Sequence, residues 1–370
     1  ALLIAYILFK YARSSRLALG QHPLGQIDSV IVCQALACPK KMLDMDMMRV
    51  ICPAVGCLLS LLAVLFVAGA SGTLPPPGPR RMELVETVRV DGGGGELRVW
   101  MPIPRSNPEQ RVELLGVESP IPWRRTREKE FGNELLYFEA RRPGAAVLRA
   151  RYRITRTEQA PAAEAQPPLS RKERELFTTP RGLAVVDEEV RRLAREAGRG
   201  SQDPLESGRR LYDAVLSLMS YDKSEPGWGE GDTRRACRVG KGNCTDFHSL
   251  FLSLAMARGL PARFLMGVPV SDSPAQELGR DYHCWAEFYA APLGWVPVDI
   301  SQAWKTGKKE SFFGSLDDRR ILFTVGRGLL LEPAQRGPRL NYFAYPHVEI
   351  DGRPDPRYAL ERLVKTQEGR

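Results

Sequence analysis

The sequence predicts an α+β protein in which a helix that begins at Cys244 packs on an antiparallel sheet, preceded by a small β-sandwich. Short segments with alternating apolar residues occupy residues 82–158, which is typical of sandwich strands. An apolar stripe with helical spacing follows Cys244, and two strand-like segments joined by a short turn lie within 282–300. Strands, then helices, then strands again indicate segregated layers rather than repeated βαβ units.

The composition is that of a globular protein. Of the 370 residues, 43% are hydrophobic and 26% are charged, so neither a disordered nor a fibrous chain is expected. The formal charge of +9 comes mostly from arginines that are spread among acidic residues, as on a solvated surface. Because no basic stripe carries interleaved aromatic residues, nucleic acid is not expected as a partner.

The first 70 residues indicate targeting rather than a folded domain, although the segment 1–47 receives no interpretation. Residues 48–70 form an apolar run after one positive charge and end in Ala-Gly-Ala at 68–70, the small-residue pattern of a signal-peptide cleavage site. The alternative is a membrane anchor, which needs about 20 apolar residues and would be the expected contact with a membrane. Either outcome predicts an extracytoplasmic protein, periplasmic or secreted.

Two domains are expected after this segment. A Pro-rich linker at 71–81 precedes the β-sandwich at 82–158, in which four glycines at 92–95 predict a hairpin connection. A second linker at 159–170 leads to a catalytic domain at 171–370. The catalytic domain is expected to begin with helices at 187–196 and 204–219 and a glycine-rich loop at 221–242.

The seven cysteines do not form a disulfide framework. Four of them precede residue 71: Cys33, Cys38, Cys52 and Cys57. The other three are Cys237, Cys244 and Cys284, so at most one bridge is expected, between Cys237 and Cys284, and it would leave Cys244 free.

Cys244 is expected at the entrance of a helix. Asn243 is a good N-cap, Asp246 favours the first turn, and Gly259 provides a C-terminal stop. A thiol at this position lies at the positive end of the helix dipole among free N–H groups, which favour its thiolate and an oxyanion. A buried free cysteine is usually a small hydrophobe, but such a residue lies within an apolar stripe and not behind a Gly-x-Gly loop.

The segments after this helix predict a base and a carboxylate that orients it. Residues 282–289 and 294–300 should pair as a hairpin. Because His283 and Asp299 are symmetric about residue 291, pairing would bring their Cβ atoms to about 5 Å. The carboxylate would then hold imidazole Nδ1 and leave Nε2 facing the thiol. Pro297 indicates an edge or bulged strand, in which the register can shift by one residue.

Three blocks of sequence, in this order, resemble the transglutaminase-like superfamily, whose core is papain-like. They are Gly-Asn-Cys-Thr-Asp-Phe-His-Ser-Leu-Phe at 242–251, Tyr-His-Cys-Trp-Ala-Glu-Phe at 282–288 and Trp-Val-Pro-Val-Asp at 295–299. The resemblance covers residues 170–350 and looks like that of the secreted bacterial branch. It implies that Cys244 is the nucleophile, His283 the base and later the acid, and Asp299 the orienting carboxylate. It also implies an aromatic residue that assists the oxyanion or the substrate, for which Tyr221 and Trp228 are the candidates.

This resemblance implies acyl transfer on an amide bond through a thioester, with a peptide or protein as substrate and no cofactor or metal. Water is the expected acceptor, as in a cysteine peptidase or amidase. Transfer to an amine, which crosslinks proteins, is the alternative.

Two other interpretations belong to different classes of protein. Cys244 and His248 fall on one helical face and, with His283 and Cys284, have the composition of a structural Cys₂His₂ metal site. Adjacent strand residues point to opposite faces, however, which separates His283 from Cys284. The second interpretation is a binding module that keeps the fold without catalysis, against which the intact Cys, His and Asp argue.

Overall fold

The structure, a computed structural model, describes residues 78–91, 93–160 and 164–367. The segment 1–47, the expected signal peptide or anchor at 48–70 and most of the Pro-rich linker lie outside the described residues. Within the described ranges, no helix combines the length and the apolar character needed to cross a bilayer.

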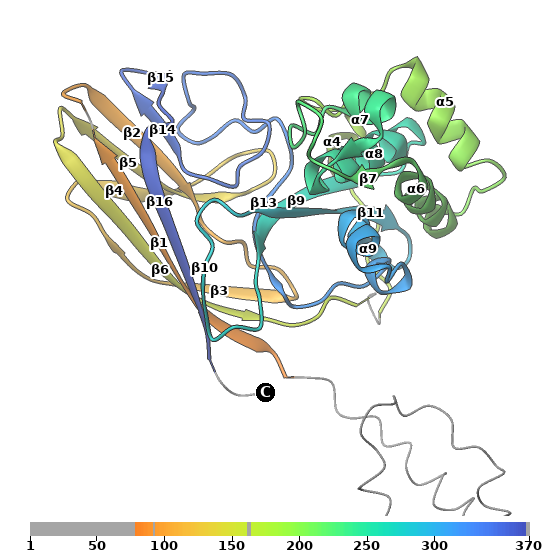
Figure 1. Ribbon diagram of the computed structural model, residues 1–370, viewed down its shortest axis with the longest axis horizontal. Coiled ribbons are helices and arrows are strands. Elements are labelled where there is room, and N and C mark those ends of the chain that lie inside the picture. The colour runs from red at the N-terminus through yellow and green to blue at the C-terminus, as the bar shows by residue number, and fades with distance from the viewer. Residues whose placement is uncertain (1–77, 92, 161–163, 368–370) are drawn as a thin grey trace, which may run out of the picture. The chain divides into compact units, whose positions relative to one another are not determined.

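A β-sandwich of two antiparallel five-stranded sheets forms one part of the protein (Figure 1). The first sheet has the order β10-β16-β1-β6-β3 and the second β15-β14-β2-β5-β4. The strands of the first sheet are β1 (Arg80–Asp91), β3 (Gln110–Glu118), β6 (Ala145–Arg156), β10 (Ala275–Glu277) and β16 (Tyr358–Thr366). Those of the second are β2 (Glu96–Pro102), β4 (Trp123–Arg127), β5 (Glu134–Arg141), β14 (His347–Ile350) and β15 (Arg353–Pro354). Alternate apolar residues of these strands, such as Leu84, Val99 and Tyr152, fill the space between the sheets.

The C-terminal strands return to this sandwich, which differs from the expected boundary at residue 170. β16 pairs with β1 from Met82 to Val90, and β14 pairs with β2. Their inward residues Val364 and Val348 are buried in the sandwich core, so residues 82–158 alone leave both sheets incomplete. The hairpin predicted at 92–95 is also wrong, because β1 and β2 belong to different sheets and do not pair.

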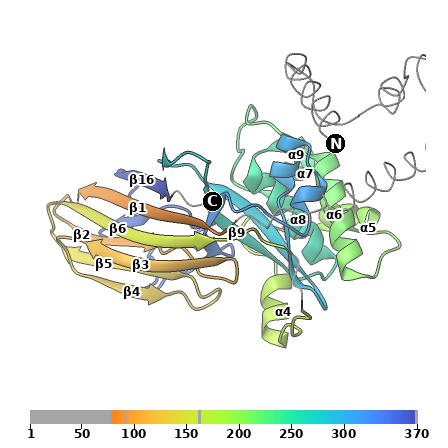
Figure 2. The ribbon, with the colours of Figure 1, turned by 90° about the horizontal axis from the view of Figure 1, so that it is seen from below.

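The second part of the protein is a four-stranded antiparallel sheet covered by helices (Figures 1 and 2). Its strand order is β12-β11-β9-β13. The strands are β9 (Ala262–Pro269), β11 (His283–Ala290), β12 (Gly294–Val298) and β13 (Arg320–Val325). The helices are α4 (Arg171–Thr178), α5 (Glu188–Ala197), α6 (Pro204–Leu218), α7 (Thr233–Val239), α8 (Cys244–Ala257) and α9 (Ile300–Thr306). The short strands β7 (Ser220–Tyr221) and β8 (Lys241–Gly242) pair in parallel just before α8.

Helix α8 is the centre of this second part and begins and ends where the sequence predicted. The Asn243 side chain accepts the Thr245 N–H, Asp246 completes a capping box, and Gly259 follows the helix with a φ of +70°. The helix is buried on nearly all sides, because α5, α6, α7 and α9 cover the faces turned away from β9 and β11. Cys244 is therefore held by a helix that has little freedom to move.

Two side-chain amides of the sandwich complete the edge strand β13. Gln110 donates to the Leu322 carbonyl at 2.9 Å and accepts the Leu322 N–H at 2.9 Å. Asn133 makes the same pair of contacts with Val325, at 2.8 Å each. These amides take the place of a neighbouring strand, which satisfies the edge and fixes the core sheet against the sandwich.

Candidate active site

Cys244, His283 and Asp299 meet at the point where α8, β11 and α9 begin. Cys244 is the first residue of α8, and His283 is the first residue of β11, on which α8 packs. Asp299 follows β12 directly and is the N-cap of α9, with its side chain accepting the Gln302 N–H. The three residues that the sequence predicted are thus brought together because the N-terminal ends of α8, β11 and α9 meet.

The pairing of β11 with β12 is shifted by one residue from the predicted register. Ala286 faces Val298 and Ala290 faces Gly294, so the hairpin is symmetric about residue 292 and not 291. Gly294 has a φ of +81°, which a glycine adopts readily, and it closes a three-residue turn. Asp299 consequently lies just beyond the paired strand and reaches His283 from the start of α9.

Asp299 contacts the opposite ring nitrogen from the one predicted. His283 Nε2 lies 2.6 Å from Asp299 Oδ2, which leaves Nδ1 as the nitrogen available to Cys244. The expected arrangement, with Nδ1 on the carboxylate, is wrong because the carboxylate approaches the far end of the ring. The carboxylate still fixes the orientation of the imidazole, as the predicted role requires.

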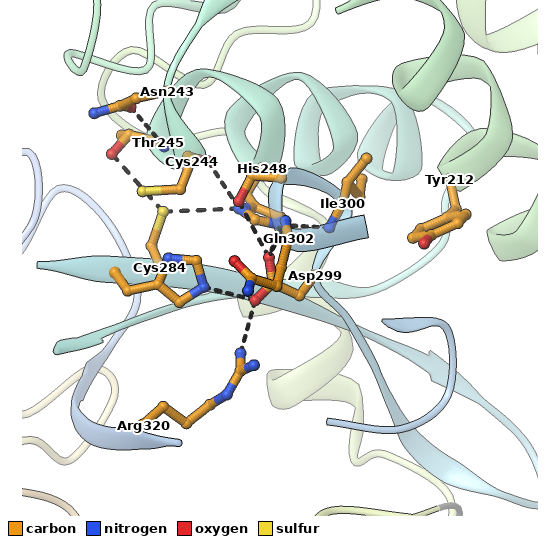
Figure 3. A network of polar contacts seen from close by, with 12 residues as sticks. Tyr212, Asn243, Cys244, Thr245, His248, Cys284, Asp299, Ile300, Gln302 and Arg320 are labelled. Atoms are coloured by element: carbon orange, nitrogen blue, oxygen red, sulfur yellow. Dashed lines mark hydrogen bonds and ion pairs between the residues drawn. The ribbon is translucent and has the colours of Figure 1, made fainter. Parts of the chain in front are cut away.

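Asp299 is a fully satisfied, buried carboxylate (Figure 3). Oδ2 accepts from His283 and from Arg320 Nη1 at 2.8 Å, and Oδ1 accepts from Ser301 Oγ at 3.1 Å and Gln302 N at 3.0 Å. Burial by itself raises the pKa of Asp299, but the charges of His283 and Arg320 outweigh it and hold that pKa well below its usual range. The carboxylate is therefore ionised throughout the neutral range.

The surroundings of Cys244 and His283 shift the pKa values of the two groups in the directions that favour a thiolate and an imidazolium. The neighbouring Cys284 thiol lowers the pKa of Cys244 most; burial opposes this, and the His283 contact and charge lower it further, to well below its usual value. Burial lowers the pKa of His283, but the Asp299 carboxylate and Cys244 outweigh it and raise that pKa to about 9. Both side chains are buried, with Cys244 2% and His283 9% exposed, and burial strengthens the electrostatic interaction between them.

His248 and Cys284 support this pair without the charge that a nucleophile or base would need. His248 donates from Nδ1 to the Cys244 carbonyl at 2.8 Å and accepts the Ile300 N–H at Nε2 at 3.0 Å. Burial lowers the pKa of His248 to about 4, so the ring is neutral and ties α8 to α9. The Cys284 sulfur lies 3.7 Å from Thr245 Oγ1 and 3.7 Å from His248 Nδ1. Burial and the Cys244 charge raise the pKa of Cys284, which keeps it a thiol.

The two aromatic candidates differ in how directly they reach the site. The ring of Tyr221 lies 6.2 Å from that of Phe247 and 6.4 Å from that of Trp304, and burial and the Cys244 charge raise its pKa. Tyr221 is therefore near enough to Cys244 for a charge on that sulfur to affect the pKa of its hydroxyl. Trp228 is 39% exposed, and the ammonium of Lys223 lies 4.8 Å from its ring centre.

The loop that carries Trp228 is fastened to the start of α8. Buried Asp246 accepts the N–H groups of Gly229 at 2.8 Å, Gly231 at 3.1 Å and Asn243 at 2.8 Å. Arg327 donates to the Gly231 carbonyl at 3.0 Å from the other side. These hydrogen bonds hold Gly229, the residue after Trp228, against the start of α8.

The metal site and the disulfide that the sequence left open both involve residues that the structure describes. In the part of the chain that the structure describes, no group of three or more His, Cys, Asp or Glu side chains is arranged to hold a metal ion. Cys237 and Cys284 are not bridged, and both are free thiols.

Arg320 is a residue of the site that the sequence did not predict. It follows Asp317, Asp318 and Arg319, a charged run that is typical of a surface turn. In the structure its side chain is 2% exposed and contacts Asp299. The sequence held one partial indication of this role. Residues 320–325 form a buried strand, and a charged residue at the start of a buried strand is unusual.

Comparison with known proteins agrees with this geometry. Residues 191–300 match the family model of the transglutaminase-like superfamily. An uncharacterized protein of Haemophilus influenzae is 30% identical over 41% of this chain and 50% of its own length, so the chain spans about half of that relative. The fold is similar to that of a candidate cysteine protease from Cytophaga hutchinsonii, with a TM-score of 0.53, 12% identity and coverage of 80% of this chain and 93% of the other.

A second solved structure is less similar. The periplasmic domain of TgpA from Pseudomonas aeruginosa gives a TM-score of 0.37 at 15% identity, covering 64% of this chain and 91% of that domain. The match to the family model spans residues 191–300, a range that contains Cys244, His283 and Asp299, and the solved structure from Cytophaga hutchinsonii shares the fold. They support cysteine-dependent catalysis in general.

Proposed function

We propose that this protein is a cysteine-dependent amidase or peptidase that transfers the acyl group of an amide to water through a thioester. The observation that carries the proposal is the continuous row from the Cys244 thiolate through His283 to Asp299. Cys244 acts as the nucleophile, His283 as acid and base, and Asp299 as the group that orients and charges the imidazole. The directions of their pKa shifts, which are downward for Cys244 and Asp299 and upward for His283, support these roles.

The first half-reaction uses groups that are already in place. The Cys244 thiolate attacks the amide carbonyl, and the C–N bond breaks as imidazolium Nδ1 gives its proton to the leaving amine. The N–H of Cys244 has no acceptor within its helix because it is the first residue of α8, so it can donate to the developing oxyanion. The Tyr221 hydroxyl, which stays protonated because its pKa is raised, is a candidate second donor.

The second half-reaction returns the enzyme to its starting state. Neutral His283 takes a proton from water, the hydroxide attacks the thioester, and the acid product leaves as the thiolate reforms. Lys223 and Lys305 lie over the rings of Trp228 and Tyr221, at 4.8 and 3.9 Å from the ring centres. A protonated amine acceptor would meet these like charges, which favours water over an amine and therefore hydrolysis over crosslinking.

We further propose that the substrate is a peptide or protein outside the cytoplasm. The support is the apolar segment at 48–70, which ends in the small-residue pattern of a cleavage site. Fusing this segment to a reporter enzyme that works only outside the cytoplasm tests the proposal, and an inactive reporter would contradict it.

The proposed chemistry is tested by mapping alkylation of the purified protein with iodoacetamide, followed by mass spectrometry of its cysteine peptides. Cys237 is an internal control, because burial raises its pKa to about 11. Cys244 should react between pH 5 and 7, where an ordinary thiol with a pKa of about 8.5 is mostly protonated. His283→Ala should shift the reactivity of Cys244 to higher pH and so reduce the difference between the two residues. Equal, alkaline reactivity of Cys237 and Cys244 in the wild-type protein would refute the thiolate pair.

Hydrolysis is separated from transfer by a second measurement. Amide substrates should release product at a rate that is unchanged by a millimolar primary amine, and no amine should appear in the product. Hydroxylamine, a small uncharged nucleophile at neutral pH, should trap the thioester as a hydroxamate. Incorporation of the amine in preference to water would replace hydrolase by transferase.

A further inference from the structure

Arg320 reaches Asp299 from the side opposite to Cys244 (Figure 3). Its Nη1 donates to Asp299 Oδ2 at 2.8 Å, the same oxygen that His283 contacts. Its Nε and Nη2 donate to Asp317 Oδ1 at 3.2 and 2.9 Å, and its guanidinium carbon lies 5.1 Å from the centre of the Trp285 ring. With the side chain 2% exposed, these contacts hold one positive charge at a fixed place.

We propose that Arg320 is a positioning residue of this site, which keeps Asp299 ionised in one orientation and whose fixed charge sets the pH range in which Cys244 and His283 work. The inference rests on the proposed function. Burial lowers the pKa of Arg320, but the Asp299 and Asp317 carboxylates outweigh it and raise that pKa, so this guanidinium stays protonated at every pH at which the protein is folded. Asp299 therefore keeps a buried counter-charge when His283 gives its proton to the leaving amine, and no carboxylate is left unpaired in the interior.

Several ionisable groups face these charges from the elements packed around them. They are Cys244 and His248 on α8, His283 and Cys284 on β11, Tyr212 on α6, Arg156 on β6 and Asp317 before β13. Burial keeps His248 neutral, and burial together with the Arg320 charge lowers the pKa of Arg156 to about 10, which leaves it cationic at neutral pH. Arg320 is the one arginine among these groups that donates a hydrogen bond to Asp299.

Removing this charge should move the whole pH profile in one direction. A nearby positive charge favours the deprotonated form of every group around it. In Arg320→Gln, both inflections of Cys244 alkylation by iodoacetamide, where Cys244 and where His283 lose their protons, should therefore shift to higher pH by about one unit. At a fixed pH on the acid limb this is about a tenfold slower reaction. Arg320→Lys keeps a charge and should restore most of the profile.

Asp317→Asn provides a second test with the opposite sign. Asp317 shares the Arg320 guanidinium with Asp299 and is 30% exposed, so the fold should tolerate its loss. Without it the positive charge is less compensated, and both inflections should move to lower pH. Arg80→Gln is the matched control, because Arg80 is 3% exposed and pairs with Asp272 and Asp318 rather than with Asp299. It should leave both inflections in place.

The outcomes separate the two proposals. Shifts of opposite sign in Arg320→Gln and Asp317→Asn, with rescue by lysine, support the charge role of Arg320, because a packing role would lower yield or melting temperature without moving the inflections. If the wild-type profile shows a depressed inflection and neither variant moves it, the inference on Arg320 is overturned and the proposed function stands. If wild-type Cys244 titrates as an ordinary thiol, both are overturned. Should Arg320→Gln fail to fold, the direction of the Asp317→Asn shift decides.

Discussion

Asp299→Asn isolates the charge of the orienting carboxylate from its shape. Asparagine is as good an N-cap as aspartate, so α9 should keep its start, and the side chain has almost the same volume. The carbonyl oxygen of the amide can still face His283 and Arg320, but its NH₂ group would then face the N–H of Gln302 and the hydroxyl of Ser301, which now donate to Oδ1. The substitution therefore removes a buried negative charge and adds a donor where donors already converge.

The size of the loss of activity in Asp299→Asn can be worked from the pKa of His283. Burial lowers the pKa of this residue, yet the Asp299 carboxylate and Cys244 raise it to about 9 from 6.5. The two favourable contributions thus exceed about 3 kcal/mol, since one pKa unit corresponds to about 1.4 kcal/mol. Without the carboxylate, the pKa of His283 should fall to 6.5 or lower, and the imidazolium fraction at pH 7 should fall from nearly all to about a quarter or less.

The assay measures both halves of the mechanism. Alkylation of Cys244 by iodoacetamide at pH 7 should slow about fourfold or more, and amide hydrolysis should fall by about 10²-fold or more because proton transfer is lost as well. Ser301→Ala is the matched control, since it removes one neutral hydrogen bond from Oδ1 and keeps the charge; its alkylation rate should stay within about twofold of the wild type. A folded Asp299→Asn protein that alkylates at the wild-type rate would refute the assignment of Asp299.

Three further predictions concern stability. Between about pH 6.5 and 8.5 the proton that Cys244 loses on folding is balanced by the one that His283 keeps, so the free energy of unfolding in urea should be flat. In Cys244→Ala only the Asp299 carboxylate raises the pKa of His283, so stability should be full below pH 6.5 and fall by about 1 kcal/mol per unit as the pH rises above it; a flat curve would contradict this. Asp246→Ala leaves three buried N–H groups without their acceptor and should cost about 3 kcal/mol in urea titration, whereas a loss below about 1 kcal/mol would mean that the loop is not clamped. Gly267→Ala would place a Cβ 2.0 Å from the Ile321 carbonyl oxygen, so its melting temperature should drop sharply, and an unchanged value would show that β13 can move.

The sequence predicted those parts of the site that depend on neighbouring residues. The start of α8 at Cys244 and its end before Gly259 follow from capping, in which a side chain satisfies N–H groups two or three residues away. The order of the nucleophile, base and carboxylate followed from three short motifs, and the structure brings these residues to one point. Strands within residues 82–158 were likewise visible as alternation, because one face of each strand meets the core.

The tertiary structure decided what depends on residues far apart in the chain. The one-residue register of β11 and β12, and with it the nitrogen of His283 that meets Asp299, was set by the conformation of Gly294 and by the start of α9. The return of β14 and β16 to the sandwich could not be seen locally, because their partners β2 and β1 lie more than 200 residues earlier. Arg320 shows the same limit. In the sequence it ends a charged run, and only the folded chain places it against Trp285 and Asp299, where desolvation and a fixed partner turn a surface-like residue into part of the site.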